Sequence, residues 1–209
     1  MRTALISAVI LASAPVTAAA GDVSVYVRDA RGRPVADAVV EITPAAGARA
    51  GPIRFPWAYR VEQRDMQFQP FVLIVPNGAE AAFPNRDNVR HHVYSFSPAK
   101  RFELKLYGKD QTRSVRFDNA GVVAVGCNIH DSMVAFIKVV DTPWAAKTDA
   151  GGAALLRGVP AGQARLEAWH PYGRPAAGVK QTIAVGRQGA VRAAVVLDIR
   201  PPARRRQGY

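Results

Sequence analysis

Short apolar stretches separated by turn residues run through the chain after its first twenty residues, and none repeats with the 3.6-residue period of a helix. Several alternate apolar and polar positions, as in Phe102-Glu-Leu-Lys-Leu106, which is typical of a strand with one buried face. Because Gly, Pro and Asp lie between the stretches, the pattern predicts an all-β fold of the sandwich or barrel type. The strands that we expect are Val23–Val27, Val39–Thr43, Val72–Val75, Glu80–Phe83, Val93–Phe96, Phe102–Tyr107, Ser114–Phe117, Val122–Val125, Val134–Val140, Ala164–Trp169 and Val195–Ile199.

The first twenty residues differ from the remainder. Arg2 is followed by an apolar run from Thr3 to Ala12, and the small residues Ala18-Ala19-Ala20 precede Gly21. This pattern is typical of a secretory signal peptide, residues 1–20, and the run is too short for a membrane span. We therefore expect a mature protein that is exported to the periplasm without stable membrane insertion. A retained anchor helix is the alternative.

Two changes in composition divide the mature chain. Ala, Gly and Pro dominate from Pro44 to Pro56, and Asp141-Thr-Pro-Trp144 forms a second break. Residues 57–141, between the two breaks, have the length of a small β-domain. The piece before the first break offers too few strands to be stable alone, whereas the piece after the second break offers more.

One loop of the central segment combines the chain's only cysteine with two other metal-binding side chains. Cys127 stands three residues before His130 and six before Met133. A thiolate, an imidazole and a thioether are the soft ligands that select copper, and a His₂Cys site with a long axial Met is the blue-copper electron-transfer arrangement. The second imidazole must come from His91 or His92. A cysteine without a partner in an exported protein also favours a ligand over a structural thiol.

Other chemistries of this loop are weaker interpretations. Cys127-x-x-His130 lacks the second cysteine of a c-type haem motif. A Cys–His nucleophile and base would leave Met133 without a role, and Asp131, within the loop, is poorly placed to orient the base. Zinc prefers Cys and His without a thioether, and a buried thiol beside an unrelated histidine is the alternative without metal. We therefore expect no catalytic residues and a protein that is not an enzyme.

Five motifs between about Tyr59 and Val140 point to a known family: Phe68-Gln-Pro70, Val75-Pro-Asn-Gly78, Phe83-Pro-Asn-Arg-Asp87 leading to His91, Phe117-Asp-Asn-Ala-Gly121 and the Cys127 loop. Together they resemble the cupredoxins, most closely the plastocyanin-like and amicyanin-like members. The resemblance implies a Greek-key sandwich with one copper ion, Cu(I) or Cu(II), at one end.

The same resemblance implies a specific ligand set. It makes His91, Cys127, His130 and Met133 the copper ligands, because the register up to Val93 places His91 at the family's ligand position. His92 then takes the place of an asparagine that commonly braces the copper loops in plastocyanin-like members. His170 lies outside this segment, and we expect a structural role for it, with a second metal site as the alternative. We expect Met66, Phe68 and Phe71 in the core rather than among the ligands.

The two flanking pieces carry a second resemblance when they are read end to end. Val25–Val40, Thr148-Asp-Ala-Gly-Gly152 and Leu156–Gly162 resemble the opening and middle hairpin of the carboxypeptidase regulatory-like β-sandwich. This implies one discontinuous sandwich, residues 21–50 and 145–199, interrupted by the copper domain. A short N-terminal extension plus a separate C-terminal domain is the alternative. The expected fold class is therefore all-β, a Greek-key cupredoxin sandwich plus a second small β-sandwich.

The chain is strongly basic, with 28 Lys and Arg against 16 Asp and Glu and a formal net charge of +12. Residues 200–209 contribute an arginine-rich stretch without apolar periodicity, which we expect to be a disordered basic tail. Such a charge favours acidic partners or an anionic membrane surface, while nucleic acid is disfavoured because no recognition motif is present.

The function that these residues predict best is electron transfer. We expect a blue-copper carrier that passes single electrons between periplasmic redox partners, through the exposed edge of His130 and in transient encounters. A periplasmic copper chaperone or reservoir is the first alternative, although the chain has only three Met for an open, Met-rich site. A surface-binding scaffold with incidental copper is the second. The pattern predicts no particular oligomeric state.

Overall fold

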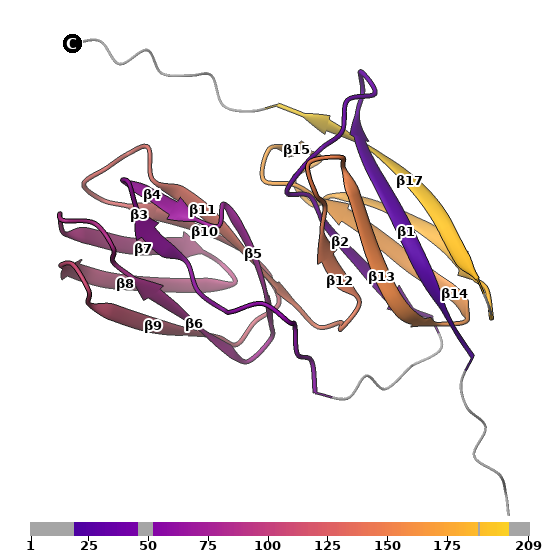
Figure 1. Cartoon of the computed structure of the whole chain (residues 1–209), viewed down its shortest axis with the longest axis horizontal. Coiled ribbons are helices and arrows are strands. Elements are labelled where there is room, and N and C mark those ends of the chain that lie inside the picture. The colour runs from indigo at the N-terminus through magenta and orange to yellow at the C-terminus, as the bar shows by residue number, and fades with distance from the viewer. Residues whose placement is uncertain (1–18, 46–51, 188, 201–209) are drawn as a thin grey trace, which may run out of the picture.

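A computed structural model of the protein describes residues 19–45, 52–187 and 189–200, and Figure 1 shows its arrangement. The regular structure of these residues is entirely β, which confirms the all-β fold class. No helix that is long and apolar enough to cross a membrane occurs in this part of the chain. Most of the predicted signal peptide and of the basic tail, and residues 46–50 of the first flank, lie outside the described residues, so the signal peptide and the tail stay predictions. The strands are β1 (Ala20–Asp29), β2 (Val39–Pro44), β3 (Glu62–Arg64), β4 (Gln67–Gln69), β5 (Val72–Pro76), β6 (Ala79–Pro84), β7 (His91–Ser97), β8 (Lys100–Tyr107), β9 (Thr112–Phe117), β10 (Gly121–Cys127), β11 (Val134–Val140), β12 (Ala145–Lys147), β13 (Ala153–Pro160), β14 (Gly162–Trp169), β15 (Gly173–Arg174), β16 (Val179–Val185) and β17 (Ala190–Ile199).

Strands β3 to β11 form the central domain. Its main sheet has the order β5-β11-β10-β7-β8, with β5 parallel to β11 and the other neighbours antiparallel. The β6–β9 pair supplies buried side chains such as Phe83 and Phe117 to the same apolar cluster as Val93 and Val125 of the main sheet. Burial of these large side chains, each contributing about 1.5–3 kcal/mol, stabilises the sandwich that holds β7 and β10 in place.

Strands β1, β2 and β12 to β17 form the second lobe of Figure 1. One sheet has the order β13-β1-β17-β15 and the other has the order β12-β2-β14-β16. Both N-terminal strands are therefore interior strands of sheets whose other members follow Asp141 in sequence. The chain leaves this sandwich after β2, forms the central domain and returns at β12. Its likeness to a carboxypeptidase regulatory-like module stays a prediction.

The two lobes are joined by an apolar cluster and by a buried ion cluster. Val72, Ile74 and Val140 of the central domain pack with Val39 and Trp169 of the second sandwich. Lys138 of β11 extends its Nζ to Oε1 of Glu41 at 2.8 Å and to Oε1 of Glu167 at 3.3 Å. Because these carboxylates belong to β2 and β14, the lysine links the central domain to strands of the second sandwich from both flanks of the chain.

Candidate metal centre

The candidate ligands lie at one end of the main sheet, where two neighbouring strands begin and end. His91 is the first residue of β7, and Cys127 is the last residue of β10, opposite Val93. Residues two apart on a strand share a face, so the sheet itself brings His91 and Cys127 together. The structure thus places His91 at the start of a strand rather than on a loop.

The loop from Cys127 to Met133 folds back on itself and adds the second imidazole. The backbone N–H of Met133 donates to the carbonyl of His130 at 3.0 Å, and the N–H of Cys127 donates to the carbonyl of Met133 at 3.3 Å. Met133 is buried in the same apolar cluster as Cys127. The closed loop thus holds His130 beside Cys127, and it buries the thioether of Met133 in the cluster to which Cys127 belongs.

The three donor atoms are spaced as a small metal ion requires. The Sγ atom of Cys127 lies 3.8 Å from Nδ1 of His91 and 3.7 Å from Nδ1 of His130, and the three residues offer donor atoms that lie within 4.8 Å of one another. Two ligands at about 2.1 Å (imidazole N) and about 2.3 Å (thiolate S) from a metal, separated by about 120°, would lie about 3.8 Å apart. The soft donor set and these distances fit one copper ion in a trigonal site.

The adjacent histidines point in opposite directions. His91 is fully buried and faces Cys127, whereas Nε2 of His92 pairs with Oε1 of Glu103 at 2.9 Å. His92 lines a shallow cavity of about 230 Å³ with Tyr94 and Phe96. Its backbone carbonyl accepts a hydrogen bond from the N–H of Asn128, at 3.1 Å, so the main chain at this position holds the Cys127 loop.

We predict opposite results for the two histidines. His91→Ala should open the copper site to water or added imidazole and change the visible spectrum, because one donor of the trigonal set is lost. His92→Ala should leave the spectrum close to native, because the ring faces Glu103. Absorption and electron paramagnetic resonance spectra of the Cu(II)-loaded variants measure this. The reverse result would make His92 the ligand.

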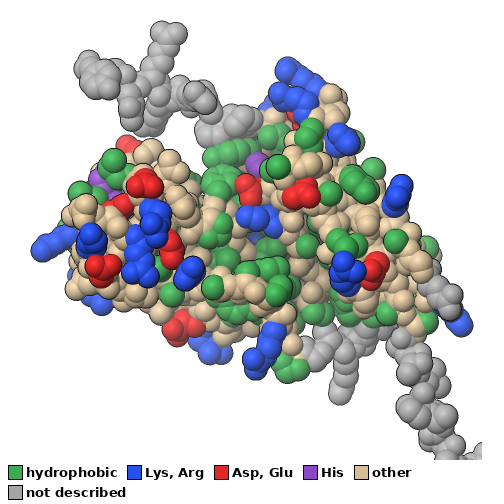
Figure 2. All heavy atoms as spheres, viewed as in Figure 1, with side chains coloured by type: hydrophobic (Ala, Val, Ile, Leu, Met, Phe, Trp, Pro, Cys, Tyr) green, Lys and Arg blue, Asp and Glu red, His purple; other side chains and the backbone are tan. Residues whose placement is uncertain are grey.

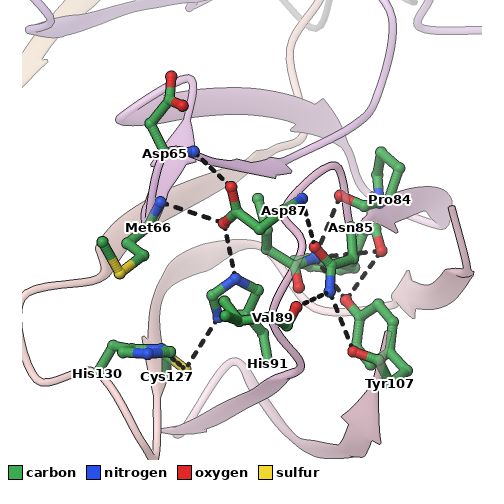
Figure 3. A network of polar contacts seen from close by, with 12 residues as sticks. Asp65, Met66, Pro84, Asn85, Asp87, Val89, His91, Tyr107, Cys127 and His130 are labelled. Atoms are coloured by element: carbon green, nitrogen blue, oxygen red, sulfur yellow. Dashed lines mark hydrogen bonds and ion pairs between the residues drawn. The ribbon is translucent and has the colours of Figure 1, made fainter. Parts of the chain in front are cut away.

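A carboxylate that the sequence reasoning missed lies behind His91. Oδ2 of Asp87 is 2.7 Å from Nε2 of His91, and the backbone N–H groups of Asp65 and Met66 donate to the same carboxylate at 2.6 and 3.1 Å (Figure 3). Burial raises the pKa of Asp87, but the hydrogen bonds from His91, Met66 and Asp65 outweigh it and hold the pKa below its ordinary value. The four-residue spacing of Asp87 and His91 gave no signal, because such a spacing brings side chains together on a helix and not in a loop that leads into a strand.

The loop that carries Asp87 is itself held by the buried side chain of Asn85. Its Nδ2 donates to the carbonyls of Val89 and Tyr107, at 2.8 and 3.0 Å, and its Oδ1 accepts from the N–H of Asp87 at 2.8 Å. These bonds satisfy a buried amide and fix the path of the chain from β6 to His91. Figure 3 shows Asn85 between this loop and Tyr107.

Two expectations about nearby residues have different outcomes. Phe68 is buried, as predicted, but Met66 is 53% exposed, so its placement in the core was wrong. Met66 has a φ of 54° in the turn between β3 and β4, which directs its side chain out of the sandwich.

His170 is buried outside the metal centre, where its Nδ1 accepts from the N–H of Tyr172 at 3.1 Å and burial lowers its pKa.

Solved copper proteins are similar to part of this chain. A copper-containing nitrite reductase (NirK) from Thermus scotoductus SA-01 is 25% identical over 48% of this chain, with a TM-score of 0.39, and the match spans only 26% of that protein. A purple cupredoxin from Nitrosopumilus maritimus is 19% identical over 39% of this chain and 98% of its own, with a TM-score of 0.36. A methionine-to-alanine mutant of amicyanin with Cu(I) is 23% identical over 50% of this chain and 99% of its own, with a TM-score of 0.37.

The central domain agrees with what its sequence motifs predict, because its donor set lies at one end of a β-sandwich. No protein-family model and no curated protein sequence matches the chain.

Proposed function

We propose that the protein is a one-electron carrier, with a single copper ion bound by His91, Cys127, His130 and Met133. The observation that supports this best is the near-equal spacing of the Cys127 sulfur from the two Nδ1 atoms, 3.8 and 3.7 Å. When bound, copper supplies a centre that alternates between Cu(I) and Cu(II) in this ligand set. The side chains of the protein hold this centre in place and control its access to solvent and partners.

Two of the proposed ligands are held rigidly, and a third is accessible from the surface. Strands β7 and β10 hold His91 and Cys127 away from water, which limits how far the donors can move when the charge of the site changes. His130 is half-buried, and its neighbour Ile129 is 48% exposed, so the imidazole edge lies beside an apolar surface. Such a surface suits the small, short-lived contacts of redox partners.

The partner and the compartment are also part of the proposal. The net charge of +12 favours an acidic redox protein, approached by long-range attraction. Figure 2 shows basic side chains scattered among acidic ones over both lobes on the visible face, so the charge is not gathered there into one patch. Action in the periplasm follows from the predicted signal peptide. We place no catalytic residue in the chain.

The exposed thioether of Met66 favours a second candidate, delivery of copper to another protein. The backbone N–H of Met66 donates to the Asp87 carboxylate, which contacts His91 in turn, so this residue lies two contacts from the donor trio. A thioether is a soft donor that suits Cu(I), and an exposed one could bind the ion on its way to or from another protein. An electron carrier keeps its copper through repeated redox cycles, whereas a delivery protein releases it.

Voltammetry in the presence of a Cu(I) chelator separates the two functions. We expect the copper-loaded protein to give a reversible one-electron wave that persists over repeated cycles, because the enclosed donors retain the metal in both oxidation states. Cys127→Ser is the control without a wave. A wave that decays within a few cycles as the chelator takes up copper would favour delivery, and a protein that takes up no copper would contradict both.

A further inference from the structure

We infer that Asp87 is a positioning residue for the metal centre, which orients His91 and stabilises the higher oxidation state of the bound metal. Its effect on the metal rests on the proposed function, whereas its effect on the His91 ring does not. The geometry behind it is a continuous line of contacts from the β3–β4 turn through Asp87 and His91 to Cys127 (Figure 3).

The first part of the argument concerns the tautomer of His91. A carboxylate can only accept a hydrogen bond, so the 2.7 Å contact between Oδ2 of Asp87 and Nε2 of His91 requires the proton on Nε2. Nδ1 then carries the lone pair, and Nδ1 is the atom that faces the Cys127 sulfur at 3.8 Å. Asp87 therefore presents His91 to the metal in the form that can bind it.

The second part concerns the negative charge. The side chain of Asp87 is only 10% exposed, and it is held in place by the N–H groups of Asp65 and Met66. Both of these residues have positive φ angles, 55° and 54°, which cost energy for residues other than glycine. The turn that supplies the two donors thus adopts a costly conformation around this carboxylate.

A buried negative charge bonded to a ligand has a definite effect on a redox site. The carboxylate makes the imidazole a stronger donor, and it offsets positive charge on the far side of the ring. Cu(II) carries one more positive charge than Cu(I), so it gains more from this arrangement. Asp87 should therefore lower the reduction potential of the centre.

The outer face of the same strand offers a matched control. His92 also pairs with a carboxylate, Glu103, at 2.9 Å, but its ring faces away from the donor trio. Asp87→Asn and Glu103→Gln each remove one charge from a histidine partner while keeping its size. A general effect of lost charge on the domain would be similar in the two variants.

The test measures the metal and the ring separately in the full mature chain. We expect Asp87→Asn to weaken Cu(II) binding by about ten- to a hundredfold, and Cu(I) binding less, so that the reduction potential rises. Glu103→Gln should leave both affinities within about twofold. In the metal-free wild-type protein, long-range ¹H–¹⁵N correlation spectra should show His91 protonated on Nε2 and free at Nδ1.

Each result bears on a different part of the proposal. Equal changes in the two variants, or a wild-type His91 protonated on Nδ1 alone, would overturn it. If the wild type binds no copper, the proposed function fails, yet the ring spectra still report whether Asp87 fixes the tautomer. If Asp87→Asn does not fold, the spectra of the wild-type ring decide the orienting role without any variant.

Discussion

Cys127→Ser is expected to abolish the intense visible absorption of the Cu(II)-loaded protein. That absorption arises from charge transfer between a thiolate and Cu(II), and Cys127 is the only cysteine in the chain. A serine hydroxyl at the same buried position is a hard, weakly acidic donor, so copper affinity should fall as well. An absorption spectrum of each protein with one equivalent of Cu(II) makes the measurement.

Met133→Gln is the matched control for this experiment. It changes a second residue of the same loop but leaves the thiolate in place, so the colour should persist while the reduction potential shifts. A colourless wild-type protein, with a Cu(II) spectrum that Cys127→Ser does not alter, would be incompatible with a blue-copper site.

Lys138→Met is expected to destabilise the protein by about 3–5 kcal/mol, because removing one partner of a buried ion cluster leaves the others uncompensated. The side chains of Lys138, Glu41 and Glu167 are 10%, 15% and 17% exposed. Thermal unfolding by calorimetry at neutral pH compares this variant with Lys180→Met. Lys180 also pairs with Glu167, at 3.4 Å, but its side chain is 54% exposed, so its loss should cost less than about 1 kcal/mol. Equal losses in the two variants would contradict the role of Lys138.

The deficit of Lys138→Met should depend on pH in a defined direction. Burial raises the pKa of Glu41, and Lys138 opposes that rise. Without the lysine the pKa of Glu41 rises further above its unfolded value, so the folded state binds the proton more tightly than the unfolded state does. Stability therefore increases as the pH falls through the folded pKa, and the deficit should shrink on acidification.

The sequence predicts best those strands that are rich in apolar residues, because such residues are buried whatever their neighbours in the fold. Val122–Val125 and Val134–Val140 lie within β10 and β11, and the spacing of Cys127, His130 and Met133 indicates a ligand loop between them. The fold class follows from such stretches. Sequence alone thus indicates both the sandwich and the donor loop that closes it.

The short hairpin β3–β4 was not predictable in the same way. Glu62-Gln-Arg64 and Gln67-Phe-Gln69 contain a single large apolar residue, and the turn between them is fixed by the carboxylate of Asp87, far along the chain. Strand β13 was obscured for another reason, since Gly158, with a φ of 64°, lies inside it. In both cases tertiary contacts or backbone exceptions override the local pattern. The role of Asp87 could be inferred only once the hairpin and β7 were side by side.

The chain connects the two sandwiches twice, once after β2 and once before β12, and this limits how the central domain can move. A domain attached by one linker can swivel about it, whereas the central domain is joined through both of its ends and is held by the ion cluster at Lys138. β11, seven residues long, runs from the donor loop toward this junction and so spans about 20 Å. The donor loop is therefore separated from the junction by the length of β11, and its orientation relative to the second sandwich is fixed. A redox partner of the proposed kind, if it touched both sandwiches, would meet the His130 edge in one orientation rather than over a range of hinge angles.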